Sequence, residues 1–198
     1  TTNQRWILQN IESPQNSYLG VGALSQIEGV FNWTMSYHRQ FSDIWMPYGM
    51  FYKLKNPVGD VVIDETTANR TTLPSVLWQA SNCAAEHRKN IVQLLQRTSL
   101  KVDIFGSCLG SDPCKRDLAC SKKLWRKYRF YLSFENSYCQ DYITEKSWQK
   151  MSFGLIPVIS GIDLENAMDL LPPNSFLHVQ NFTSIEALAE HITYIHQN

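Results

Sequence analysis

Apolar residues after position 75 fall into short runs separated by stretches with helical spacing. The short runs predict five strands, over residues 76–78, 102–105, 128–134, 155–159 and 176–179. The stretches between them predict helices after residues 81–82, over 122–127, over 144–153 and over 183–195. Strands that alternate with helices indicate an α/β fold with a parallel, doubly wound sheet, in which ligands bind at the carboxyl ends of the strands.

The first third of the chain has a weaker pattern. Residues 5–11 predict a strand that stops before Pro14, and residues 21–29 predict a short helix. Residues 51–75 are the least periodic stretch, and we interpret them as the connection between two domains. Because the chain opens within an apparent strand and closes within an apparent helix, we expect it to be part of a longer protein.

Residues 134–157 carry the most informative pattern. An apolar strand leads through a polar loop into a helix that Thr144 can cap, and Gly154 and Pro157 end that helix before the next strand. The free N–H groups and the macrodipole at such a helix N-terminus favour a bound phosphate, and Lys146 adds a full positive charge. This pattern predicts a nucleotide-diphosphate site in an α/β domain, and an ordinary strand-to-helix turn with solvated charges is the alternative.

The same run resembles a known signature. The chain reads F-E-N-S at 134–137 and D-Y-I-T-E-K at 141–146, which is similar to the motif F-E-N-S-x-x-x-D-Y-[IV]-T-E-K of the α1,3/4-fucosyltransferases, glycosyltransferase family 10. The resemblance implies a GT-B-like α/β fold of two Rossmann-like, doubly wound domains, the first only partly present. Residues 1–70 would then be the C-terminal part of the acceptor-side domain and a linker. Residues 71–198 would form the GDP-fucose-binding domain, truncated at its C-terminus.

The resemblance also implies a function. We expect an inverting α1,3-fucosyltransferase that moves fucose from GDP-fucose to a GlcNAc-containing glycan on glycoproteins or glycolipids. The alternatives are a non-catalytic nucleotide-sugar-binding or glycan-binding relative, and a transferase for another nucleotide sugar. A non-catalytic relative should lose the base or the phosphate-binding cations, whereas Glu12, Arg88 and Lys146 are all present here, which favours the enzyme.

Glu12 is the candidate catalytic base. Transfer of a glycosyl group with inversion needs a base on the acceptor hydroxyl, and a carboxylate at a strand end suits that task. Glu12 precedes Ser13 and Pro14, a segment similar to the E-S-P segment of the family, whose Glu is the proposed base. The alternative is a surface carboxylate at a turn.

The candidate donor-binding residues are Arg88, Asn136, Tyr142, Glu145 and Lys146. Arg88 follows an S-N-C segment similar to that of the family, and its guanidinium can bind two phosphate oxygens at once. The resemblance assigns Asn136 and Tyr142 to the donor and Glu145 to its ribose. The chain has no Asp-x-Asp pair, so we expect no metal site and no cofactor requirement: GDP-fucose would bind without a divalent metal, held by cationic side chains.

Composition, net charge and sequons limit the classes of partner and the cellular compartment that we expect. The 198 residues are 43% apolar, enough for one substantial core or two small ones, and the formal net charge is zero, which argues against a nucleic-acid partner. Three N-glycosylation sequons, at Asn32, Asn69 and Asn181, point to the secretory lumen. The resemblance implies a Golgi membrane protein, single-pass type II, with a lumenal catalytic domain and an N-terminal transmembrane helix that is absent here.

Five cysteines also favour an oxidising compartment. Cys108, Cys114, Cys120 and Cys139 crowd around the signature, so we expect one or two disulfides among them, with Cys83 as the odd thiol. Zinc is the alternative, although neither a C-x2-C pair nor a supporting pair of histidines appears.

Overall fold

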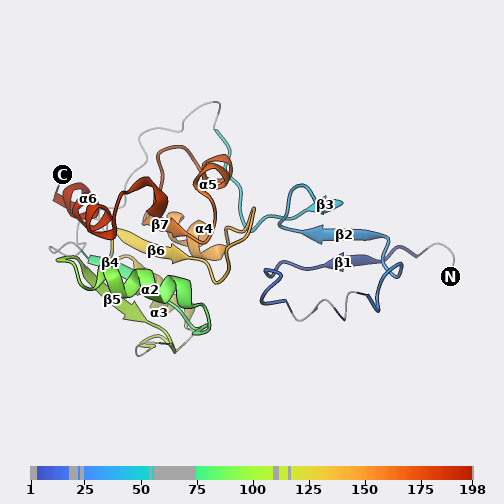
Figure 1. Cartoon of the computed structure of the whole chain (residues 1–198), viewed down its shortest axis with the longest axis horizontal. Coiled ribbons are helices and arrows are strands. Elements are labelled where there is room, and N and C mark those ends of the chain that lie inside the picture. The colour runs from blue at the N-terminus through green and yellow to red at the C-terminus, as the bar shows by residue number, and fades with distance from the viewer. Residues whose placement is uncertain are drawn as a thin grey trace.

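The computed structural model describes residues 4–17, 22, 25–53, 55, 75–108, 112–115 and 117–197. Two separate sheets lie side by side in Figure 1, and every strand pairing in both is parallel. We call the sheet β1–β3 with its loops the small lobe, and the sheet β4–β8 with its helices the large lobe. The predicted α/β class with parallel sheets is confirmed. The predicted boundary at residue 70 lies outside the described residues and stays a prediction.

The large lobe has five strands in the order β5-β4-β6-β7-β8. The strands are β4 (Ser75–Gln79), β5 (Lys101–Phe105), β6 (Phe130–Phe134), β7 (Ile156–Ser160) and β8 (Leu177–His178). The chain runs outward from β4 to β5, then returns past β4 to β6 and continues in the opposite direction. This reversal between β4 and β6 creates a crevice at the carboxyl ends of the two strands, where doubly wound folds bind ligands.

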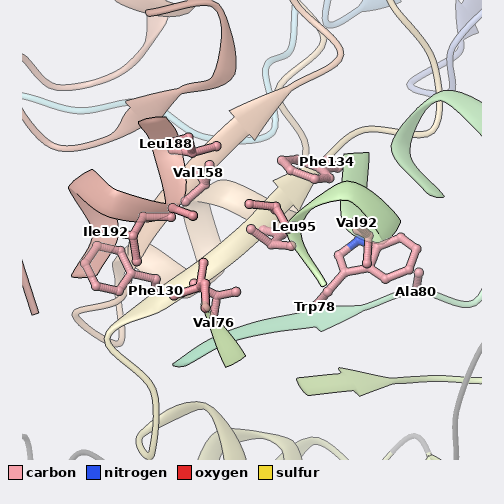
Figure 2. Packing of buried hydrophobic residues seen from close by; sticks show 13 residues of the cluster. Val76, Trp78, Ala80, Val92, Leu95, Phe130, Phe134, Val158, Leu188 and Ile192 are labelled. Carbon is pink, nitrogen blue, oxygen red and sulfur yellow. The ribbon is translucent and has the colours of Figure 1, made fainter. Parts of the chain in front are cut away.

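Side chains alternate between the two faces of this sheet. One face buries Val76 and Trp78 of β4 and Phe130, Leu132 and Phe134 of β6. These side chains pack against α2 (Glu86–Leu95) and α6 (Ile185–Gln197). Figure 2 shows Phe130 and Phe134 pointing to the same side as Val92 and Leu95 of α2. The other face buries Leu77 and Tyr131 and carries α3 (Leu118–Trp125), α4 (Glu145–Met151) and α5 (Leu164–Leu170). A helix on each face gives the three layers of a doubly wound fold.

The helix starts differ from the prediction in three places. Helix α2 begins at Glu86, and no side chain caps it, because Asn82 Oδ1 instead accepts from the Ala84 N–H in a turn before the helix. Helix α3 begins at Leu118, four residues earlier than predicted. The predicted capping box from Thr183 to Glu186 is wrong by one residue, since Ser184 Oγ accepts from the N–H of Ala187. Thr144 caps α4 as predicted, accepting from the Lys146 N–H.

Glycine 106 marks the end of β5. Its φ is +110°, and an added Cβ would lie 2.2 Å from the carbonyl oxygen of Ala80. The loops after β4 and β5 therefore pass very close to each other at the carboxyl edge of the sheet.

The small lobe contains a three-stranded parallel sheet of β1 (Ile7–Gln9), β2 (Trp33–Ser36) and β3 (Ile44–Trp45). The predicted strand at 5–11 is thus present in its central part. The predicted helix at 21–29 is wrong at its described end, because residues 25–30 form turns; the rest of it lies mostly outside the described residues. Among the residues that the structure describes, no helix is long and apolar enough to span a membrane.

Two disulfides join the loops of the large lobe. Cys83 bonds Cys108 with a Cα–Cα distance of 5.2 Å, and Cys114 bonds Cys120 at 5.3 Å. One disulfide is present among the four cysteines where it was predicted, between Cys114 and Cys120, but the prediction that Cys83 is the odd thiol is wrong. Cys83 follows β4 and Cys108 follows β5, and these neighbouring parallel strands end at the same edge. Cys139 is instead the free thiol among the described cysteines.

Candidate active site

A cavity of about 270 Å³ lies at the carboxyl ends of β4 and β6, where the strand order reverses. We call it the donor cavity. Its lining combines residues of β4 and the loop after it, α2, β6 and the loop after it, and α4. The residues that line it are Gln79, Ala80, Ser81, Asn82, Arg88, Tyr131, Asn136, Glu145, Lys146 and Lys150. Four of the five predicted donor-binding residues are therefore in one place.

The N-terminus of α4 holds an internal anion. The Glu135 carboxylate is fully buried and accepts from the backbone N–H of Thr144 at 2.8 Å and from its hydroxyl at 3.0 and 2.9 Å. The N–H groups of Lys146 and Ser147 are taken by Thr144 itself. The N–H groups of Thr144, Lys146 and Ser147 are therefore not free to bind a phosphate, because the protein supplies its own acceptors, and the predicted phosphate site at this helix end stays a prediction. Cationic side chains are what remains for an external phosphate.

Lys146 is held in place by that carboxylate. Its Nζ lies 2.9 Å from Glu135 Oε2 and 2.9 Å from Thr144 Oγ1, and its side chain is 20% exposed. Burial raises the pKa of the Glu135 carboxyl, and the Lys146 ammonium opposes that rise. The pair fixes the ammonium at the rim of the donor cavity, although part of its charge is balanced internally.

Arg88 is 2% exposed and forms a wall of the donor cavity. Its guanidinium donates to the carbonyl oxygens of Phe134 and Asn82, at the carboxyl ends of β6 and β4, and lies 5.8 Å from the ring centroid of Trp78. No carboxylate among the described residues pairs with it, and its Nε has no hydrogen-bond partner in that part of the chain. Burial lowers the pKa of Arg88, which remains a strong base and stays charged. The protein thus buries an unbalanced positive charge at the crevice.

Glu145 and Asn136 also line the donor cavity. Glu145 is the first residue of α4, and its side chain is 58% exposed, so its carboxylate is accessible to a hydroxyl donor. Asn136 follows β6 and donates through Nδ2 to Glu12 Oε1 at 3.4 Å. Its Oδ1 is buried without a hydrogen-bond partner among the described residues. A ligand that donates a hydrogen bond could satisfy it.

Glu12 reaches the large lobe from the small lobe. Its Oε1 accepts from the Ser13 N–H at 2.8 Å, from the Tyr142 hydroxyl at 2.5 Å and from Asn136. Burial alone would raise the pKa of Glu12, but the hydrogen bonds from these three residues outweigh it and lower the pKa below the usual value. The group is therefore an ionised carboxylate at neutral pH.

Glu12 also lines a second cavity, of about 220 Å³, in the small lobe. We call it the small-lobe cavity. Its lining includes polar groups of Asn10 and Ser36 and the rings of Tyr37 and Phe41. Aromatic faces beside hydrogen-bonding groups suit a sugar ring. The Glu12 carboxylate thus faces this cavity while it touches Asn136 of the donor cavity.

Tyr142 lies apart from the other predicted donor-binding residues. It is 1% exposed and does not line the donor cavity. Its ring packs against Tyr37 at 4.9 Å and against Tyr48 at 6.1 Å, both from the small lobe. Burial and the bond to Glu12 raise the pKa of its hydroxyl, which stays protonated and donates. In this structure Tyr142 positions Glu12.

Further contacts join the lobes, among them a hydroxyl pair and an ion pair. Ser13 Oγ lies 2.7 Å from Ser137 Oγ, and both hydroxyls are buried. Arg39 donates through its backbone N–H and its Nε to the Asp141 carboxylate, at 2.9 and 3.1 Å, and Asn166 donates to the same carboxylate. Asp141 has φ = +60° and does not cap α4.

Lys150 is the charged residue of the donor-cavity lining that the sequence analysis missed. It lies four positions after Lys146, which places both side chains on one face of α4. That spacing was the available signal, but a lysine in the last turn of a helix is usually a solvated charge. Among the described residues, no group of three His, Cys, Asp or Glu side chains could hold a metal ion.

The parallel strand order, the crevice between β4 and β6 and the cationic cavity define a doubly wound α/β protein with a candidate anion site at the point where the strand order reverses. Comparison with protein-family models identifies the family. Residues 68–198 match the C-terminal domain of glycosyltransferase family 10 (fucosyltransferase), and residues 1–49 match the N-terminal fucosyltransferase domain. The chain belongs to glycosyltransferase family 10, a family of fucosyltransferase enzymes, as the signature predicted.

Curated relatives agree. An α-(1,3)-fucosyltransferase 7 from Rattus norvegicus is 34% identical over 94% of this chain and 46% of its own length. An α-(1,3)-fucosyltransferase 4 from Bos taurus is 36% identical over 98% of this chain and 48% of its own length. The chain therefore spans about half the length of the curated relatives it matches.

Solved structures show the same fold. An α1,3-fucosyltransferase crystallised with GDP-fucose has a TM-score of 0.65 and 19% identity, covering 99% of this chain and 64% of that chain. The structure with GDP has a TM-score of 0.67 over 99% of this chain and 63% of that chain. The GT-B-like fold class predicted from the sequence is confirmed.

Proposed function

We propose that this chain carries the donor site and the catalytic base of an inverting α1,3-fucosyltransferase that uses GDP-fucose. The observation that carries the proposal is the position of Glu12. Its ionised carboxylate faces the small-lobe cavity, and its Oε1 accepts from Asn136, which lines the donor cavity. A base between an acceptor and a donor is what direct displacement at a sugar carbon requires.

The reaction follows from this arrangement. An acceptor hydroxyl in the small-lobe cavity gives its proton to Glu12, and its oxygen attacks the anomeric carbon of fucose from one face. The bond from that carbon to the β-phosphate oxygen breaks on the opposite face, so the configuration inverts and GDP leaves. Charge that develops on the diphosphate is stabilised by Arg88 and Lys146, which need no reorganisation as the bond breaks. The transition state resembles an oxocarbenium ion, as in glycoside hydrolysis.

We assign the donor residues the roles predicted from the sequence, with the exception of Tyr142. Glu145 is exposed at the cavity and can accept from a ribose hydroxyl. Asn136 offers its unpartnered Oδ1 to the donor. Tyr142 contributes through Glu12. The α1,3-fucosyltransferase structures solved with GDP-fucose and with GDP support a guanosine diphosphate donor.

We further propose a GlcNAc-containing glycan on a glycoprotein or glycolipid as the acceptor, and the Golgi lumen as the site of action, with a membrane anchor in the complete protein. Two disulfides fit an oxidising compartment. The described sequon residues Asn32 and Asn181 are exposed. The donor is expected to bind without divalent metal, since side-chain cations already face it.

The test is a product assay. The protein is offered GDP-fucose with N-acetyllactosamine or an N-glycan core, and the linkage and anomeric configuration of the product are read by NMR. Glu12→Gln keeps the shape of the side chain but cannot accept a proton, so kcat should fall roughly 10²–10⁴-fold while GDP affinity stays unchanged. Near-normal kcat in this variant would overturn the assignment of the base.

A further inference from the structure

Lys150 occupies an unusual position for a lysine. It lies in the last turn of α4, is only 5% exposed, and lines the donor cavity beside Lys146. Its Nζ lies 4.3 Å from the ring centroid of Trp125 and 4.9 Å from that of Tyr131. The rings bind the ammonium through their faces without neutralising it.

The charge of Lys150 is not balanced by a direct partner. Lysines are almost never buried unless they are paired, yet the Lys150 ammonium donates at 3.4 Å to the neutral side chain of Gln149. Among the described residues no carboxylate forms an ion pair with it, whereas Lys146 is paired with Glu135 at 2.9 Å. The most buried ammonium of the cavity is therefore also the one that is free to bind an external anion.

We propose that Lys150 is a further donor-binding residue, whose ammonium binds a phosphate oxygen of the nucleoside diphosphate and stabilises it as the leaving group. This rests on the proposed function of the donor cavity. Arg88 forms one wall of that cavity, and Lys146 and Lys150 follow one face of α4 along another. Internal partners engage Arg88 through two carbonyl oxygens and Lys146 through a carboxylate. The positive charges of Arg88 and Lys146 are therefore partly engaged within the protein, whereas the charge of Lys150 is available to the phosphate.

A pH dependence follows from its surroundings. Burial lowers the pKa of Lys150 to about 8, while the nearby carboxylates Glu145 and Glu135 raise it and the Lys146 ammonium lowers it further. A bound diphosphate favours the charged form and so raises the pKa. Below pH 8 the ammonium is already charged, and binding takes up few protons. Above pH 8 the free protein has lost that proton and must regain it, so GDP affinity falls as the pH rises.

The experiment is calorimetric titration at pH 7 with GDP and with guanosine, which lacks the phosphates. Lys150→Met removes the charge and keeps an unbranched side chain. We expect it to weaken GDP roughly 10- to 100-fold, the range for a hydrogen bond to a charged group, and to leave guanosine affinity unchanged. Lys122→Met is the matched control, because Lys122 also lies over an aromatic ring, Phe153 at 5.5 Å, but does not line the donor cavity.

Proton uptake separates this role from a structural one. Titrations at pH 8.5 in buffers of different ionisation enthalpy should show proton uptake on GDP binding by the unmodified protein and much less by Lys150→Met. Lys150→Arg keeps its charge throughout and should bind GDP with nearly constant affinity between pH 7 and 9. This variant also covers the case in which Lys150→Met does not fold.

The outcomes are distinct. If the unmodified protein binds GDP and Lys150→Met binds it equally well, or loses GDP and guanosine affinity to the same extent, the assignment of Lys150 is wrong and the proposed function stands. If the unmodified protein binds neither GDP nor GDP-fucose, the proposed function itself is wrong, and this inference with it.

Discussion

The Tyr142 hydroxyl donates a 2.5 Å hydrogen bond to Oε1 of Glu12, and the two residues come from different lobes, 130 positions apart. Tyr142 lies in the loop before α4, whereas Glu12 follows β1. The same carboxylate faces the small-lobe cavity. The fold therefore sets the position and the pKa of the proposed base from the large lobe.

Tyr142→Phe tests that control. Removing the hydroxyl deletes a hydrogen bond that lowers the pKa of Glu12, so the pKa should rise and the acid limb of the kcat/KM profile should move to higher pH. Because the Glu12 carboxylate would be held less firmly, kcat should also fall, by up to roughly 10²-fold. A pH–rate series measures both. Tyr48→Phe is the control, because the Tyr48 hydroxyl donates to the carbonyl oxygen of Ile11 and not to the base. Equal shifts of the acid limb in the two variants would contradict the assigned role of Tyr142.

Arg39 and Asp141 provide a second link between the lobes. Burial raises the pKa of Asp141, but Asn166 and Arg39 outweigh it, so the pKa lies below its usual value in the folded protein. Arg39→Ala leaves a buried carboxylate with fewer donors and should lower the free energy of unfolding by about 1–3 kcal/mol at pH 7. Urea denaturation measures this loss.

The same pair has a defined pH dependence. Because the folded pKa of Asp141 is below the unfolded value of about 3.9, its stabilisation is complete above that value and is lost as the pH falls through the folded pKa. The difference between Arg39→Ala and the unmodified protein should shrink as the pH is taken below about 4. Lys101→Ala is the control, since Lys101 pairs with Asp103 at the surface and its side chain is 58% exposed; such pairs contribute little. A gap that stays constant with pH would show that Arg39 acts through packing alone.

The disulfide pairing illustrates where sequence reasoning ends. The alternation of strand runs and helical spacing predicted the parallel fold. The signature also predicted that Asn136, Glu145 and Lys146 lie in one cavity, because these residues are close together in the sequence. Cys83 and Cys108 meet for a different reason: their strands β4 and β5 are neighbours in the sheet. Strand order depends on the packing of the whole lobe, and periodicity along the chain does not encode it.

The sequence pattern also did not predict the contacts between the two lobes. Glu12 and Asn136 are 124 positions apart, and no local pattern predicts which carboxylate of the small lobe reaches the large one. Lys150 was missed because its burial depends on Trp125 and Tyr131, which come from α3 and β6. The sequence also carried no signal that the Glu135 carboxylate would be buried at the N-terminus of α4.

The two disulfides should stabilise the protein to different extents. Cys83 and Cys108 are 25 positions apart in the sequence, whereas Cys114 and Cys120 are 6 positions apart. Loop entropy predicts a loss of about 3.5 kcal/mol for Cys83→Ser with Cys108→Ser and about 2 kcal/mol for Cys114→Ser with Cys120→Ser. Chemical denaturation under non-reducing conditions gives both values, and peptide mapping gives the connectivity. A mapped bond to Cys139 would contradict the pairing.

GDP binding should need no divalent metal. Arg88, Lys146 and Lys150 line the donor cavity, and such charges can hold a diphosphate directly. Calorimetry should give the same GDP affinity with excess EDTA as without it. Affinity that disappears in chelator and returns with Mn²⁺ would show that a metal, and not these side chains, carries the diphosphate.

Lys146→Ala should weaken GDP by roughly 1.5–3 kcal/mol in the same assay, the contribution of a hydrogen bond to a charged group. The variant also removes the partner of the buried Glu135 carboxylate, so its thermal unfolding is measured first, and Lys146→Arg is used in parallel because it keeps the charge. Lys89→Ala is the control, since Lys89 pairs with Glu86 on α2 and does not line the cavity. A folded Lys146→Ala that binds GDP as tightly as Lys89→Ala would leave Arg88 and Lys150 as the diphosphate ligands.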